Sequence, residues 1–255
     1  MKLLETDKLS INFGGLRALS NLSLEINKGE LVGLIGPNGA GKTTVFNLLT
    51  GVYQPSEGGI YFNGENTYGL KPYQVTQKGI ARTFQNIRLF SELSVLDNVK
   101  IAYNFHIPYG LVEAVFRVGR YFRNEKHVEE QAIELLKIFN LEDKMYETAK
   151  NLPYGEQRRL EIARALATQP QLLLLDEPAA GMNPQETNDL TKMIRWIRDE
   201  FSLTVLLIEH DMSLVMDLCE RIYVLEYGVN IAHGLPEEIR NNPKVIEAYL
   251  GEEVS

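Results

Sequence analysis

A glycine-rich stretch near the amino terminus constrains the fold more than any other feature of the sequence. Residues 36–43 match G-x-x-x-x-G-K-[ST], between an apolar run (31–35) that predicts a buried strand and a segment (42–49) that predicts a helix. Glycines let the backbone approach phosphate oxygens, and a helix N-terminus adds partial positive charge. The sequence therefore predicts a nucleotide site, in which Lys42 contacts the β- and γ-phosphates and the Thr43 hydroxyl ligates Mg²⁺. The predicted nucleotide-binding residues of the loop are Gly36, Pro37, Asn38, Gly39, Ala40, Gly41, Lys42, Thr43 and Thr44.

Two adjacent carboxylates end a second apolar run. Asp176 and Glu177 directly follow the four leucines at 172–175. An acid at a strand end can hold Mg²⁺ through water, and its neighbour can polarise the water that attacks a γ-phosphate. We therefore expect Asp176 to serve the metal and Glu177 to activate water. A GTPase would need a guanine-reading N-K-x-D motif, and the sequence contains none.

Short apolar runs between amphipathic segments indicate the class of fold. Such runs are typical of strands buried on both faces, and their alternation with helices favours a mostly parallel sheet covered on both sides. The expected strands lie at 31–35, 171–175, 203–208 and 221–225. The first 30 residues are expected to be extended, because Leu22, Leu24 and Ile26 alternate with polar residues.

The middle of the chain has a different pattern of apolar residues, which predicts an inserted helical lobe. Apolar residues recur at helical spacing in two groups. These are Leu111, Val115, Val118 and Phe122, and then Val128, Ala132, Leu135, Leu136 and Phe139. We expect one domain over 1–255, with an α/β core formed by 1–91 and 151–255 and a helical lobe over about 92–150.

Composition excludes several other classes of protein. The chain has 26 Lys and Arg against 34 Asp and Glu, a formal charge of −8, which argues against nucleic acid as a partner. No apolar run approaches the roughly 18–20 residues of a membrane span. The single cysteine, Cys219, cannot form an intramolecular disulfide. A soluble cytoplasmic protein is expected.

The order of motifs along the chain resembles the nucleotide-binding subunits of ABC transporters. Phe13 lies upstream of the phosphate loop, where that family stacks an aromatic ring on adenine, and Gln85 in Arg82–Asn86 matches the Q-loop. Residues 152–159 lie where the signature motif falls, 180–183 occupy the D-loop, and His210 matches the switch histidine. The resemblance implies a P-loop ABC cassette with a RecA-like, mostly parallel sheet, an antiparallel β subdomain and an inserted helical subdomain.

The resemblance also implies roles for individual residues. Gln85, Glu177 and His210 would be catalytic, and Thr43, Gln85 and Asp176 would hold Mg²⁺. In the family, the signature of one subunit closes on the ATP of the other. Here that contact falls on Leu152, Pro153, Tyr154, Gly155 and Glu156.

Four short sequence segments resemble, more specifically, those of importer ATPases for branched-chain amino acids. They lie at 13–19, 81–85, 154–166 and 236–243. This implies a Mg²⁺-dependent ATPase at the cytoplasmic face of the cell membrane. Its partners would be two membrane-spanning permease subunits, a second ABC ATPase and, indirectly, an extracytoplasmic solute-binding protein. An ATPase for urea, another amino acid or lipid, a soluble non-transport ABC ATPase and a small-molecule P-loop kinase remain as alternatives.

The signature departs from the family pattern at two positions. Pro153 stands where serine is usual and Tyr154 where the first glycine is usual, and Asn183 replaces the common aspartate of the D-loop. Proline offers neither a hydroxyl nor an N–H, so donors to the opposite γ-phosphate should be missing. These departures suggest a heterodimer with a second ATPase that carries an intact signature.

Overall fold

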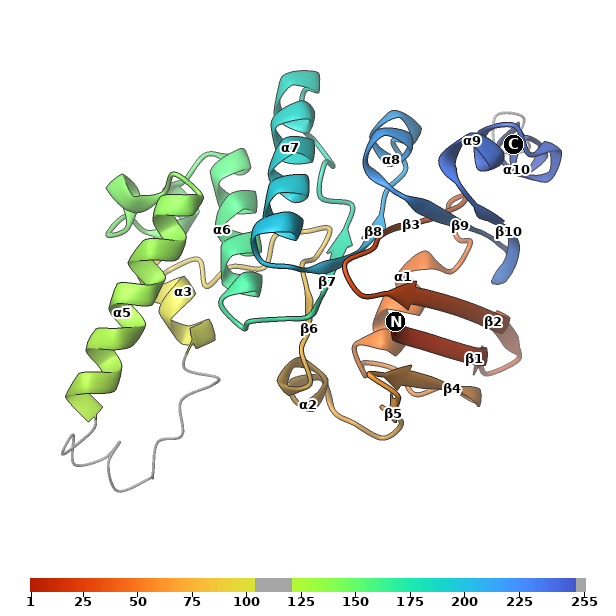
Figure 1. Ribbon diagram of the computed structural model, residues 1–255, viewed down its shortest axis with the longest axis horizontal. Coiled ribbons are helices and arrows are strands. Elements are labelled where there is room, and N and C mark those ends of the chain that lie inside the picture. Colours follow the sequence, from red (N-terminus) through yellow and green to blue (C-terminus); the bar gives the residue numbers. More distant parts are fainter. Residues whose placement is uncertain (104–120, 251–255) are drawn as a thin grey trace. The chain divides into compact units, whose positions relative to one another are not determined.

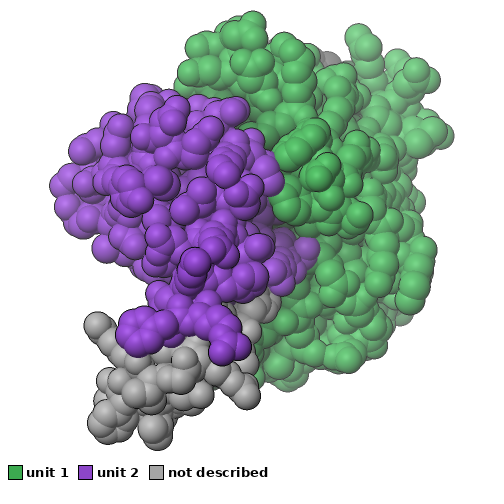
Figure 2. All heavy atoms as spheres, turned by 60° about the vertical axis from the view of Figure 1, so that its left-hand side comes forward, with its two compact units in different colours: residues 1–85, 171–255 green, residues 86–170 purple. Residues whose placement is uncertain are grey.

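A computed structural model describes residues 1–103 and 121–250 of the chain. Leu111, Val115 and Val118 of the expected helical pattern lie outside these residues. The chain divides into two compact units, coloured separately in Figure 2. Unit 1 comprises residues 1–85 and 171–255, and unit 2 comprises residues 86–170.

A six-stranded sheet organises unit 1, with strand order β10-β9-β3-β8-β7-β6. Its strands are β3 (Leu31–Ile35), β6 (Ile80–Arg82), β7 (Leu172–Asp176), β8 (Thr204–Ile208), β9 (Arg221–Glu226) and β10 (Val229–Gly234). All neighbours pair in parallel except β10, which runs antiparallel to β9. Every residue of β3, β7 and β8 is buried. The expected parallel sheet is confirmed, and its central strands are unbroken apolar runs because both faces are covered.

The two faces of this sheet pack against different layers of the unit. Leu172, Leu174 and Leu206 join a core with the helix α1 (Lys42–Leu49) and a second sheet. Figure 1 shows α7 (Pro184–Glu200) and α8 (Met212–Leu218) covering the opposite face. The shorter helices of unit 1 are α2 (Pro72–Gln77), α9 (Pro236–Arg240) and α10 (Pro243–Leu250).

The second sheet of unit 1 is antiparallel, with order β2-β1-β4-β5. Its strands are β1 (Lys2–Phe13), β2 (Leu16–Asn27), β4 (Glu57–Phe62) and β5 (Glu65–Asn66). Leu22, Leu24 and Ile26 of β2 are buried against α1, whereas Ser23 and Asn27 are exposed. The alternation thus gives one dry and one wet face, as the sequence predicted.

The secondary structure of unit 2 consists, in its described residues, of helices joined by turns, with one isolated bridge between Ser94 and Thr148. It contains α3 (Val95–Tyr103), α5 (Tyr121–Ile138), the 3₁₀ turns η2 (Glu142–Lys144) and η3 (Ala149–Asn151), and α6 (Tyr154–Leu166). α3 packs against both α5 and α6. The second group of apolar residues predicted for this lobe, from Val128 to Phe139, is buried. The expected limits of about 92 and 150 lie inside unit 2, and α6, which we expected in the core, belongs to this unit because its neighbours are helices.

Candidate active site

The carboxyl ends of β3, β8 and β7 meet at one edge of the six-stranded sheet, termed here the active edge. Leu34 of β3 and Asp176 of β7 both lie level with Ile208 of β8. The phosphate loop follows β3, Glu177 follows β7 and His210 follows β8, so the register alone brings these segments to the same edge. In parallel α/β sheets, ligands bind at this end of the strands.

Close backbone packing explains the two end glycines of the phosphate loop. Gly36 has φ 149° and Gly41 has φ 104°, conformations that L-residues rarely adopt. A Cβ on Gly36 would overlap the Leu225 carbonyl oxygen, and one on Gly41 would lie 2.9 Å from Leu19 Cδ2. The Gly228 N–H donates to the Ala40 carbonyl at 2.9 Å, so the turn after β9 supports the loop from behind.

Lys42 lies inside the loop that it follows. The residue is 8% exposed, and its Nζ donates to the carbonyls of Gly36 and Pro37 at 2.6 and 2.9 Å. Lys42 is also the first residue of α1, after a Gly41 N-cap that has no side chain to accept from the first turn. The helix N–H groups and the ammonium therefore favour an anion at the same place.

The three residues predicted to be catalytic lie together at the active edge. Gln85 Nε2 donates to Glu177 Oε2 at 2.7 Å, and His210 Nδ1 lies 3.8 Å from the same oxygen. Glu177 has a left-handed backbone, φ 45°, and its N–H donates to the Ile208 carbonyl. This conformation turns the backbone sharply after β7, so that the chain at Glu177 no longer continues the strand that ends at Asp176. Strained backbone of this kind often occurs at functional sites.

The predicted metal ligands have chemistry that fits Mg²⁺. Thr43 offers a hydroxyl, Gln85 an amide oxygen and Asp176 a carboxylate, and oxygen donors are the ligands that Mg²⁺ prefers. Asp176 is 4% exposed, and its Oδ2 pairs with Arg82 Nη2 at 2.6 Å. Arg82 was not among the sequence-predicted residues, although its position at the end of an apolar strand resembles that of Asp176.

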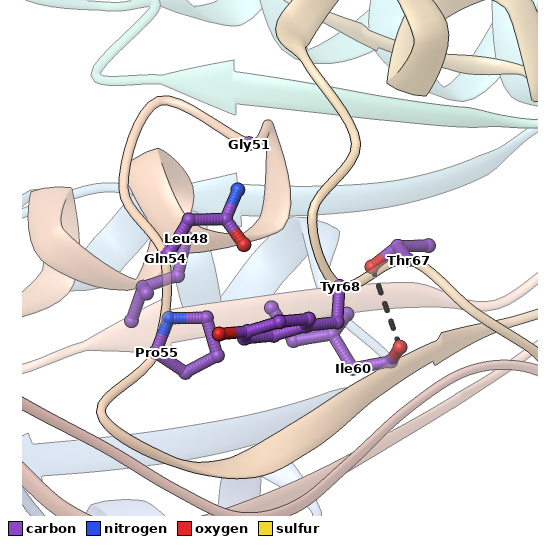
Figure 3. Close-up of a pocket in the computed structure, with 7 residues that line it drawn as sticks. All are labelled: Leu48, Gly51, Gln54, Pro55, Ile60, Thr67 and Tyr68. Carbon is purple, nitrogen blue, oxygen red and sulfur yellow. Dashed lines mark hydrogen bonds between the residues drawn. The ribbon is translucent and has the colours of Figure 1, made fainter.

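Phe13 lies at the end of β1 with 43% of its surface exposed. Its ring meets Tyr53 edge to face at 5.1 Å between centroids, so two aromatic rings, not one, stand at this position. A separate small pocket in unit 1 is lined by residues between Leu48 and Tyr68, and Figure 3 shows the Tyr68 ring extending toward Pro55. Its volume of about 10 Å³ admits a single water and excludes a nucleobase.

The signature residues differ in exposure, and the exposed Tyr154 is also bonded within α6, where its hydroxyl accepts from Arg158 Nη2 at 3.3 Å. Pro153 is the N-cap of α6, and its carbonyl accepts from the N–H groups of Glu156 and Gln157 at 3.0 Å each. Pro153 and Tyr154 are exposed. By contrast, Leu152 is buried within unit 2, and Glu156 binds Lys144 Nζ at 2.6 and 2.7 Å. These contacts give Leu152 and Glu156 a place in the helical unit itself.

Asn183, which departs from the family's aspartate, caps α7. Its Oδ1 accepts from the Glu186 N–H at 3.0 Å, while Glu186 Oε2 accepts from the Asn183 N–H at 2.9 Å. Asparagine and aspartate are equally good at this N-cap position. The substitution therefore preserves the start of α7.

Glu209 is a buried carboxylate that sequence reasoning missed. It is fully buried between β8 and His210, and it accepts from the N–H groups of Ala179 and His210 at 2.8 and 3.2 Å. Loss of solvation raises the pKa of this carboxyl above its usual 4.5, against smaller opposite effects from these hydrogen bonds. Glu209 thus connects the segment after β7 to the switch histidine.

The raised pKa of Glu209 predicts a pH-dependent stability. A raised native-state pKa stabilises the fold fully below the unfolded value near 4.5, and this contribution is lost as pH rises through the native value. Glu209→Gln should remove that loss, so the free energy of unfolding of the variant relative to wild type should increase as the pH rises above about 4.5, by at most about 1.4 kcal/mol per pH unit. Urea unfolding at several pH values measures this, and parallel pH profiles would contradict it.

Sequence comparison identifies the class of protein that this site defines. Residues 19–180 match the family model described as ABC transporter, and residues 229–255 match one described as branched-chain amino acid ATP-binding cassette transporter. The chain belongs to the ABC transporter family, as an ATPase subunit of a transport complex with membrane components. None of its described helices is long and apolar enough to cross a membrane.

Individual relatives match almost the whole chain. It is 47% identical to the high-affinity branched-chain amino acid transport ATP-binding protein BraF of Pseudomonas aeruginosa, over 98% of both chains. It is 48% identical to the corresponding LivG protein of Salmonella typhimurium, again over 98% of both. A crystal structure of the ADP conformation of an ATP-binding cassette of an ABC transporter superposes with a TM-score of 0.85, at 31% identity over 98% of this chain and 99% of that one. The predicted family and fold are confirmed, and ATP is the nucleotide.

Proposed function

We propose that this chain hydrolyses Mg²⁺-bound ATP to power the import of branched-chain amino acids, at the cytoplasmic face of a cell membrane. The observation that carries the hydrolytic site is the meeting of Gln85, Glu177 and His210 beside the phosphate loop. The solute class is supported by the named relatives and by the family match at residues 229–255.

The geometry supports a division of labour at the active edge. The loop N–H groups and Lys42 would bind the phosphates, and Thr43, Gln85 and Asp176 would hold the metal, which when bound neutralises phosphate charge. Glu177 would accept a proton from the attacking water, with its carboxylate oriented by the Gln85 amide at 2.7 Å. His210 would stabilise the charge that develops on the γ-phosphate. Phe13, with Tyr53 beside it, would stack on adenine.

The assembly follows from the family resemblance. Two cassettes would enclose two ATP molecules, each between a phosphate loop and the signature of the opposite subunit, here residues 152–156. Two membrane-spanning permease subunits would convert opening and closing into transport, and an extracytoplasmic solute-binding protein would deliver the solute. Because Pro153 is exposed and has neither the hydroxyl of the usual serine nor an N–H, the second cassette would be a different chain with an intact signature.

Pro153→Ser tests this asymmetry. In a complex whose copy of this chain also carries Glu177→Gln, the remaining turnover comes from the partner's ATP. The new hydroxyl should raise that turnover about 2- to 10-fold, the worth of one hydrogen bond. Steady-state ATPase assays of the purified complex measure it, with circular dichroism to check that α6 is retained. Unchanged turnover would show that the altered signature is neutral.

Transport by cells that carry Glu177→Gln tests the solute class. Uptake of labelled leucine, isoleucine and valine should fall steeply, because the ATP bound at the phosphate loop of this chain is no longer hydrolysed and only the partner's ATP still turns over. Glutamate and urea uptake in the same cells are the controls. Normal leucine uptake with loss of another solute would reassign the substrate. No transport defect at all, with the chain recovered from soluble assemblies, would favour a non-transport ABC ATPase.

A further inference from the structure

Arg82 is a buried cation that connects three elements of the active edge. It ends β6, and its side chain is 7% exposed. Its Nη2 donates to Asp176 Oδ2 at 2.6 Å and its Nη1 to Asn47 Oδ1 at 2.7 Å. Asn47 lies on α1, the helix that begins at Lys42, and Asp176 ends β7. One guanidinium thereby ties the helix after the phosphate loop to the predicted metal ligand.

Aromatic rings hold this guanidinium in place. The Arg82 Cζ lies 5.4 Å from the centroid of the Phe46 ring and 5.0 Å from that of Phe84. Both distances are within the range of a cation–π contact. Two fixed hydrogen bonds and two rings leave the charge little freedom to move, so it stays beside Asp176.

The charge of Arg82 changes what Asp176 offers to a metal. Arginine keeps its proton in proteins, so the pair contains a permanent positive charge opposite the carboxylate. Without bound nucleotide, a divalent cation near Asp176 meets the Arg82–Asp176 ion pair, whose net charge is close to zero. Lys42 adds a further positive charge at the phosphate loop. The phosphates of ATP would supply the negative charge that is missing. The hydrogen bond from Arg82 is to Oδ2, so Oδ1 would be the oxygen that ligates a metal or its water.

We propose that Arg82 is a positioning residue that orients Asp176 and makes metal binding at the active edge depend on bound nucleotide. The proposal rests on the proposed function, in which Asp176 is a metal ligand. By linkage, any factor by which ATP raises metal affinity is also the factor by which the metal raises ATP affinity. Arg82 therefore lowers the affinity for the free cation and increases this coupling.

Mn²⁺ binding to the full chain, followed by electron paramagnetic resonance, tests the proposal without turnover. Wild type should bind Mn²⁺ at least 100-fold more weakly alone than with a non-hydrolysable ATP analogue. Arg82→Gln should bind free Mn²⁺ about 10-fold more tightly than wild type, and Arg82→Lys, which keeps the charge, should stay within about 2-fold of wild type. Arg221→Gln is the matched control, since Arg221 pairs with Glu30 at 2.8 Å at the opposite end of β9.

The outcomes separate this inference from the site assignment. If Arg82→Gln folds and its affinity for free Mn²⁺ equals that of wild type, the inference is overturned. If the variant does not fold, the wild-type measurement decides, because tight Mn²⁺ binding without nucleotide also overturns it. Asp176→Asn tests the underlying assignment: unchanged Mn²⁺ binding with the nucleotide would remove Asp176 from the metal site altogether.

Discussion

Glu177→Gln is expected to keep ATP affinity close to wild type while lowering the rate of hydrolysis by about 10²–10⁴-fold, the range typical of a general base. The amide has nearly the shape of the carboxylate and can still pair with Gln85, which donates to Glu177 at 2.7 Å. What it loses is the ability to accept a proton from water. Phosphate release measured in single-turnover experiments, with equilibrium binding of a fluorescent ATP analogue, checks both parts.

The control for this variant is Glu200→Gln. Glu200 is an exposed carboxylate at the end of α7, so its replacement changes the net charge equally without touching the active edge. It should hydrolyse ATP at the wild-type rate. Near-normal hydrolysis by Glu177→Gln would mean that another group activates water, and Glu177 would then serve only to orient Gln85.

Much of the active edge could be predicted because it follows from strand periodicity. Apolar runs at β3, β7 and β8 indicate buried parallel strands, and polar residues directly after them must meet at one edge. Glu177 and His210 therefore come together at this edge, although their individual roles remain predictions. Gln85 joins them because it follows β6, a three-residue strand that the periodicity did not indicate.

Contacts between residues far apart in sequence could not be predicted in the same way. Arg82 and Asp176 are paired across neighbouring strands, and neither residue carries a local signal that names the other. Glu209 is similar, because a single acid between a strand and a histidine gives no sign that it is buried. From the sequence, the residues of α6 are predicted to belong to the core, because the helical lobe is expected to end at about residue 150, whereas tertiary packing places this helix with α3 and α5.

Gly36→Ala is expected to destabilise the chain far more than Gly39→Ala, although both glycines lie in the phosphate loop at positive φ. The added Cβ at Gly36 would overlap the backbone carbonyl of Leu225, and a strand backbone cannot rotate away as a side chain can. Strain and overpacking together should cost about 2–4 kcal/mol in the free energy of unfolding. Displacement of the loop should also lower ATP affinity at least 10-fold.

Gly39 provides the matched comparison within the same loop. Its φ is 76°, and a Cβ there would meet nothing within 4 Å, so only the left-handed conformation is penalised, by about 1–2 kcal/mol. Urea unfolding without nucleotide separates the two costs, because any bound ATP would add its own stabilisation. Equal losses in the two variants would mean that β9 yields to the methyl group. The close contact between the phosphate loop and the end of β9 would then not be the reason why residue 36 is glycine.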